Sequence, residues 1–87
     1  MLGGFVEYDV DLSQVGCGCL TAFYGVSMPA VDNTEDPFMY CGAGKSAKAA
    51  CPEFDIMEAN SFGFRSTSHK CDPADENGVF SQCDHSG

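Results

Sequence analysis

The chain has 87 residues, of which 44% are hydrophobic and 11% aromatic. This composition favours one small folded domain over a disordered chain. Thirteen acidic against four basic residues give a formal net charge of −9. That charge argues against nucleic acids and acidic membrane surfaces as partners, because both are anionic. No stretch approaches the ~20 apolar residues needed to span a membrane.

Six cysteines in so short a chain call for either metal binding or disulfides. No cysteine and histidine set has the spacing of a zinc site, and no motif indicates a cofactor or another metal. We therefore expect disulfides in an oxidising, extracellular setting and a secreted protein. Residues 1–4 lack the features of a signal peptide. The true beginning of the protein is accordingly expected to lie outside this chain.

Two segments in the first third alternate between apolar and polar residues, as strands with one buried face do. They are residues 5–12, whose polar face carries three acids, and residues 20–28. A glycine-containing turn at residues 13–18 joins them. Antiparallel pairing of the two segments is the simplest expected topology.

Residues 30–37 are predicted to form an acidic surface loop, which lacks the ligand spacing of a calcium-binding EF-hand. Residues 38–41 are a short apolar run. Residues 42–50 are a loop of small residues that carries two lysines. Its glycines do not have the spacing of a phosphate-binding loop, so that function is rejected.

Residues 51–60 (Cys-Pro-Glu-Phe-Asp-Ile-Met-Glu-Ala-Asn) interleave acids with apolar residues. On a strand, Glu53 and Asp55 share one face, and strict alternation puts Glu58 on the other. One extra residue near Ile56 and Met57, a β-bulge, would return Glu58 to the face of the other two acids. We predict a bulged strand carrying three carboxylates. The alternative is an amphipathic helix with a solvated acidic face, because Glu, Met and Ala favour helices.

Paired carboxylates on one face are what glycoside hydrolysis requires. A retaining enzyme uses one carboxylate as nucleophile and the other as acid and then base. An aspartate between them can help to keep their two pKa values apart. The three acids therefore favour a glycosidase, and the solvated acidic surface remains the alternative.

Residues 62–69 alternate phenylalanine with polar residues and are predicted to form a further strand, followed by a polar loop to residue 87. The expected fold is all-β with antiparallel sheet. Each strand buries only one face, so a second layer must cover the sheet. The chain is expected to be part of a larger sandwich or a small sheet held by disulfides.

Taken together, these segments resemble glycoside hydrolase family 7, the cellobiohydrolases and endoglucanases that degrade cellulose and related β-1,4-glucans. The run Glu53-Phe54-Asp55-Ile56-Met57-Glu58-Ala59-Asn60 resembles the catalytic strand of that family. Residues 8–13 and 22–28 resemble its paired strands, and Thr67, His69 and Cys71 resemble the residues that follow the catalytic strand. The blocks occur in the order of the family over nearly the whole chain.

The resemblance implies a jelly-roll β-sandwich of the concanavalin A-like type, represented by a single partial, truncated domain at residues 1–87. It also implies roles for three acids. Glu53 is the implied nucleophile and Glu58 the implied general acid/base, while Asp55 is the implied assisting carboxylate that hydrogen-bonds Glu53.

Further residues are implied to bind substrate: His69, Arg65 and Asn60. A buried or loop histidine bonded to the backbone is the alternative for His69. The implied partner is a β-glucan polysaccharide or oligosaccharide. The remainder of the domain, or a partner chain, is expected to cover the sheet.

The resemblance also implies two disulfides, Cys41–Cys51 and Cys71–Cys83. Cys17 is implied to pair with a cysteine outside this chain, and Cys19 has no implied partner.

Two functions without catalysis remain open. A shortened relative could bind carbohydrate without hydrolysing it. A structural or interaction subunit would instead pack its exposed apolar faces on a partner or on a second copy.

Overall fold

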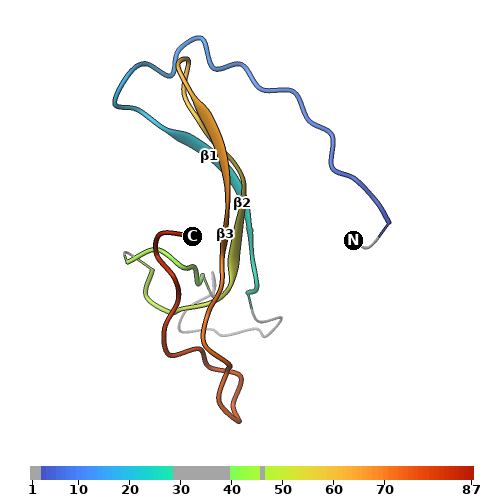
Figure 1. Cartoon of the computed structure of the whole chain (residues 1–87), viewed down its shortest axis with the longest axis vertical. Coiled ribbons are helices and arrows are strands. Elements are labelled where there is room, and N and C mark those ends of the chain that lie inside the picture. The colour runs from blue at the N-terminus through green and yellow to red at the C-terminus, as the bar shows by residue number, and fades with distance from the viewer. Residues whose placement is uncertain (1–2, 29–39, 46) are drawn as a thin grey trace.

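The computed structural model describes residues 3–28, 40–45 and 47–87. Within these residues there are three strands, β1 (Thr21–Val26), β2 (Glu53–Ala59) and β3 (Phe64–His69), and no helix. The strands form one antiparallel sheet in the order β1-β2-β3 (Figure 1). The protein is therefore all-β, as the alternating sequence pattern predicts. No helix in the described part of the chain has the length and apolar character needed to cross a membrane.

The central strand β2 is delimited by its own sequence. Pro52 precedes it and has no N–H to donate to a neighbouring strand. Asn60 ends it and begins the turn to β3, where its backbone N–H donates to the Gly63 carbonyl at 3.0 Å. The Asn60 side-chain Oδ1 accepts the N–H groups of Phe62 and Gly63, each at 2.9 Å. An asparagine bonded to its own turn is typical of tight connections.

The bulge predicted within β2 is confirmed on both of its edges. Toward β1, Phe23 pairs with Met57 and Tyr24 with Asp55, so that Ile56 has no opposite residue. Toward β3, the same irregularity lies between Asp55 and Glu58. One extra residue reverses the alternation of side chains beyond it. The helical alternative for residues 51–60 is wrong.

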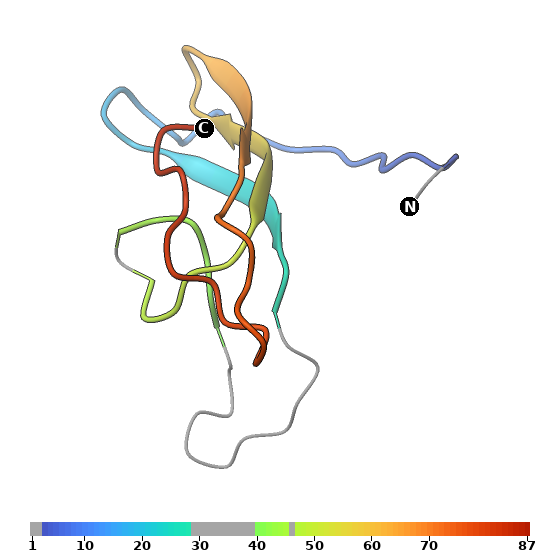
Figure 2. The ribbon, with the colours of Figure 1, turned by 60° about the horizontal axis from the view of Figure 1, so that its bottom comes forward.

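The prediction of a strand at residues 5–12 is wrong, and so is its pairing with residues 20–28. The segment is an extended, exposed chain that runs away from the sheet in both views (Figures 1 and 2). It contacts the sheet through Tyr8, whose ring meets that of Phe23 edge-on with centroids 5.1 Å apart. β1 pairs instead with β2, which puts Phe23 opposite the buried Met57. Tertiary pairing overrides local alternation here.

Two other predicted strands are confirmed with shorter bounds. Residues 20–28 contribute Thr21–Val26, and residues 62–69 contribute Phe64–His69. The predicted acidic loop at residues 30–37 lies outside the described residues, as do residues 38 and 39 of the apolar run at 38–41. The loop at residues 42–50 folds back on itself, because the Gly42 N–H donates to the Ala49 carbonyl and the Cys51 N–H to that of Gly42.

The buried apolar side chains are few, and all but one of them are cysteines or alanines. Those in the described residues are Cys41, Ala43, Cys51, Met57, Ala59 and Cys83. The Cα radius of gyration is 14.9 Å, whereas a compact domain of this length has about 12 Å. A second sheet that would complete a sandwich is not present in the residues that the structure describes. The fold therefore depends on its disulfides and on polar contacts more than on a hydrophobic core.

Candidate functional site

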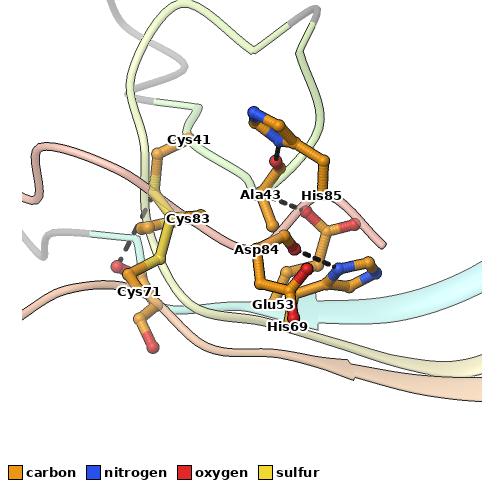
Figure 3. The surroundings of a disulfide bond; sticks show 10 residues. Cys41, Ala43, Glu53, His69, Cys71, Cys83, Asp84 and His85 are labelled. Carbon is orange, nitrogen blue, oxygen red and sulfur yellow. Dashed lines mark hydrogen bonds between the residues drawn. A yellow bond between two sulfur atoms is a disulfide. The ribbon is translucent and has the colours of Figure 1, made fainter. Parts of the chain in front are cut away.

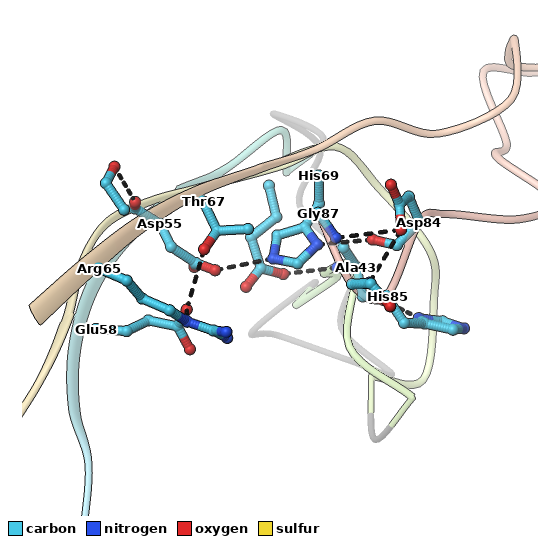
Figure 4. Close-up of polar contacts among 12 residues, drawn as sticks. Ala43, Asp55, Glu58, Arg65, Thr67, His69, Asp84, His85 and Gly87 are labelled. Carbon is cyan, nitrogen blue, oxygen red and sulfur yellow. Dashed lines mark hydrogen bonds and ion pairs between the residues drawn. The ribbon is translucent and has the colours of Figure 1, made fainter.

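The bulge in β2 gathers the three predicted acids on one face of the sheet. Directly opposed residues of an antiparallel pair share a face. The opposed pairs are Glu53 with Val26 and His69, Asp55 with Tyr24 and Thr67, and Glu58 with Ala22 and Arg65. We call the face that carries Glu53, Asp55 and Glu58 the carboxylate face. Figure 4 shows its polar contacts.

Glu53 is held by the backbone of the 42–50 loop. The Ala43 N–H donates to Glu53 Oε2 at 2.6 Å, a short hydrogen bond to a carboxylate. A methyl group at Gly42 would lie 2.7 Å from that oxygen and 3.2 Å from the Tyr40 hydroxyl. Only glycine at position 42 therefore lets the loop approach Glu53 so closely.

Asp55 and His69 form a buried ion pair. The His69 Nε2 lies 2.9 Å from Asp55 Oδ2, and their side chains are 9% and 6% exposed. His69 Nδ1 donates to the Asp84 carbonyl at 2.6 Å. Burial by itself would lower the pKa of His69, but these two hydrogen bonds and the nearby carboxylates outweigh it and raise the pKa. When both ring nitrogens carry protons, His69 is a cation that neutralises Asp55.

This arrangement differs from the hydrogen bond between Asp55 and Glu53 that the resemblance implies. Among the described residues, the side-chain hydrogen bond of Asp55 goes to His69, and none joins it to Glu53. Asp55 thus contacts the histidine while Glu53 contacts the loop. His69 is buried and bonded to a backbone carbonyl, as the alternative interpretation has it, and its role in substrate binding stays a prediction.

Glu58 is paired with Arg65 across the β2–β3 ladder. Arg65 Nε donates to Glu58 Oε2 at 2.7 Å, and the Thr67 hydroxyl donates to the same oxygen at 3.3 Å. The Arg65 side chain is 65% exposed, whereas that of Glu58 is 14% exposed. The hydrogen bond from Arg65 is the main cause that lowers the pKa of Glu58, and it exceeds the opposing effect of burial.

Two tyrosines next to the carboxylates were missed by sequence reasoning. The Tyr24 and Tyr40 hydroxyls share a hydrogen bond of 3.1 Å. That bond, followed by burial and by the electrostatic effects of Tyr24, Glu53 and Asp55, raises the pKa of Tyr40 to about 12. Tyr40 therefore keeps its proton, within the hydrogen bond that it shares with Tyr24. The alternation of residues 20–28 does put Tyr24 on a face with Ala22 and Val26, but nothing local shows that this face carries the acids.

Asn60 lies at the end of β2 and is occupied by local contacts. Besides its turn bonds, its Nδ2 donates to the Cys19 carbonyl at 3.2 Å. The structure thus brings Glu53, Asp55, Glu58, Arg65 and His69 onto one face and uses Asn60 to join the 60–63 turn to the 15–19 turn.

Both implied disulfides are present, Cys41–Cys51 and Cys71–Cys83, and Cys17 and Cys19 are exposed free thiols. Figure 3 shows Cys71–Cys83 beside Ala43, Glu53 and His69. His85 Nδ1 donates to the Ala43 carbonyl, which joins the segment after Cys83 to the loop that holds Glu53. Disulfides of this kind indicate an oxidising environment.

The part of the chain that the structure describes contains no evident set of metal ligands. No group of three or more histidine, cysteine or acidic side chains is placed there to hold an ion. What the carboxylate face offers is two separate carboxylates, Glu53 and Glu58, each with a distinct hydrogen-bond donor.

Comparison of the chain with protein-family models, with curated proteins and with solved structures found no match.

Proposed function

We propose that this chain carries the catalytic strand of a retaining glycoside hydrolase that cleaves β-1,4-glucosidic bonds in cellulose or a related β-glucan. The observation that carries the proposal is the bulge in β2, which puts Glu53, Asp55 and Glu58 on one face. Two carboxylates on one wall, each with its own partner, are what the double-displacement mechanism needs. The resemblance of residues 53–60 to the catalytic strand of glycoside hydrolase family 7 supports the same assignment.

Glu53 would be the nucleophile. Its Oε2 is bonded to the Ala43 N–H, which leaves Oε1 to attack the anomeric carbon. The new bond joins Glu53 to the sugar, and the bond to the leaving oxygen breaks. The Ala43 N–H would hold the carboxylate in place between turnovers.

Glu58 would be the acid and then the base. In the first step it gives its proton to the leaving oxygen. In the second it takes a proton from the water that displaces Glu53 from the sugar. His69 would neutralise Asp55, which lies between Glu53 and Glu58 on β2. The two glutamates would then not be exposed to the uncompensated negative charge of Asp55.

We further propose a secreted protein with the jelly-roll sandwich fold implied by the resemblance. The two disulfides support an extracellular site of action. The exposed Phe54 and Phe64, on the face opposite the carboxylates, support a second sheet, from the rest of a larger domain or from a partner chain.

The test is turnover of a fluorogenic β-cellobioside by the oxidised chain at mildly acidic pH. We expect Glu53→Gln to abolish turnover and Glu58→Gln to reduce it by roughly 10²–10⁴-fold. Glu76→Gln changes an exposed acid in the 72–78 loop and is the matched control. Undiminished turnover in Glu53→Gln would contradict the proposal.

A second function, binding of a β-glucan without hydrolysis, is favoured by one observation. Arg65 keeps Glu58 ionised, whereas a general acid must hold a proton. Binding of cellotetraose measured by calorimetry, with no cleavage product in chromatography, would identify this function. Release of cellobiose would exclude it.

A further inference from the structure

The contact between Arg65 and Glu58 joins a well-exposed cation to a largely covered acid. Arg65 Nε lies 2.7 Å from Glu58 Oε2, and the side chains are 65% and 14% exposed. Thr67 donates to the same oxygen. Because both donors come from β3, they turn Oε2 toward that strand. The guanidinium, in contrast, is anchored in the described residues by this single ion pair and can move into solvent.

The two steps assigned to Glu58 need opposite protonation states. Donating a proton to the leaving oxygen requires the neutral acid, while accepting a proton from water requires the carboxylate. A guanidinium stays charged at any relevant pH and stabilises only the carboxylate. The Arg65 contact therefore disfavours the first step and favours the second.

We propose that Arg65 is a positioning residue that holds Glu58 ionised and turned toward β3, so that Arg65 limits the proton-donating step and assists the proton-accepting step. The proposal rests on the assignment of Glu58 as acid/base. It adds that the first step proceeds fastest when the guanidinium has left Oε2.

Other charged groups around Glu58 do not account for this effect. On β1, the residue opposite Glu58 is the uncharged Ala22, and the next one on that face is Tyr24. On β2, Asp55 and Glu53 carry negative charge, which opposes ionisation of Glu58. On β3, His69 is the other cation, but its ring is bonded to Asp55. Arg65 is thus the group that favours the carboxylate most strongly.

The first measurement is a carbon-13 NMR titration of the Glu58 side-chain carboxyl, assigned by its loss in Glu58→Gln. We expect Arg65→Ala to move the titration of Glu58 to higher pH and Arg65→Lys to restore part of the wild-type behaviour. Lys48→Ala removes an equal charge at an exposed position of the 42–50 loop and should leave the titration unchanged. An unchanged titration in Arg65→Ala would overturn the proposal.

The second measurement is the pH profile of β-cellobioside turnover. We expect Arg65→Ala to extend activity to higher pH, raising the ratio of kcat/KM at neutral to that at acidic pH on the order of tenfold. Loss of activity by the same factor at every pH would indicate a merely structural role and overturn the proposal. If the titration of Glu58 moves in Arg65→Ala but neither the wild type nor any variant has turnover, the glycosidase assignment fails. The effect of Arg65 on the ionisation of Glu58 is then still supported by the titration.

Discussion

Gly42 shows how one residue without a side chain determines the environment of a proposed catalytic group. The Ala43 N–H reaches Glu53 Oε2 at 2.6 Å only because position 42 carries no Cβ. That atom would lie 2.7 Å from the same oxygen, closer than carbon and oxygen can approach without displacement. The glycine is therefore a requirement of the site and not merely of the turn.

We predict that Gly42→Ala separates Glu53 from the Ala43 N–H. Displacement of the reacting carboxylate from its place on the sheet should reduce turnover by about 10²-fold, because a misplaced reacting group costs about that much. Gly25→Ala is the control, because a methyl group there meets no atom within 4 Å. Equal turnover in Gly42→Ala and wild type, measured on the same β-cellobioside, would show that the Ala43 contact is dispensable.

The Asp55–His69 pair makes a second residue-scale contribution, to stability. The pKa of His69 is raised in the folded chain by the Asp84 carbonyl and by Asp55, against the effect of burial. A raised pKa means that the folded state binds the proton more tightly than the unfolded state. The stabilisation is then complete below the pKa of an unfolded histidine, about 6.5, and is lost as the pH rises through the folded value.

We predict that the urea midpoint of unfolding falls as the pH is raised from about 6.5. In His69→Gln this decrease should disappear, because the titrating group is absent. His85→Gln removes the other histidine, retains the Asp55–His69 pair and should keep the decrease. Urea titrations at a series of pH values, followed by circular dichroism, give the midpoints. A midpoint that rises with pH in the wild type would contradict the assignment.

At the scale of elements, the loop at 42–50 is held to the sheet by the Cys41–Cys51 disulfide. This bond closes a loop between residues 10 apart in sequence. Its second cysteine stands two positions before Glu53, so the disulfide also places the donor at Ala43 next to its acceptor. An isolated bridge between Ala50 and Phe80 connects the same loop to the C-terminal segment.

We predict that replacing Cys41 and Cys51 together by serine lowers the free energy of unfolding by about 2–3 kcal/mol. Glu53 should also lose its loop contact, so turnover falls more than stability alone explains. The paired control is Cys17→Ser with Cys19→Ser, because these exposed thiols form no disulfide. Denaturant midpoints under non-reducing conditions would show the difference, and equal midpoints for the two double variants would refute it.

For the whole molecule, the main feature is a sheet with one polar face and one apolar face. The face opposite the carboxylates carries Phe23, Phe54 and Phe64, which are 42%, 53% and 63% exposed. Met57 and Ala59, which lie between these phenylalanines on β2, are already buried, but exposed aromatic side chains on one face of a sheet mark a surface that can pack on another layer. The face therefore favours association with another layer of structure.

We predict that the isolated chain self-associates through this face as its concentration rises. Replacing Phe54 by serine and Phe64 by threonine should lower the weight-average sedimentation coefficient at high concentration. Phe5→Ser is the control, because Phe5 is 85% exposed but lies in the extended segment away from the sheet (Figure 1). A concentration-independent coefficient in the wild type would refute the prediction.

Local patterns in the sequence were sufficient for part of the fold. Strand periodicity located the ends of β1, β2 and β3 to within two residues. The bulge was predicted because the acids before and after Ile56 share one face only if one extra residue lies between them. Periodicity failed at residues 5–12, because alternation shows only that a strand is possible and not that a neighbour is available to complete its hydrogen bonds. The two disulfides followed from the resemblance of the cysteine pattern.

The sequence by itself determined the all-β class, the acidic character and the carboxylates of β2, because composition and a period of two are local properties. Only the tertiary structure decided which groups meet those carboxylates. The Ala43 N–H, the Tyr24–Tyr40 pair and the bond of Asp55 to His69 join residues 10 to 16 positions apart. Such contacts depend on strand register and loop closure, which one extra residue at Ile56 is enough to change.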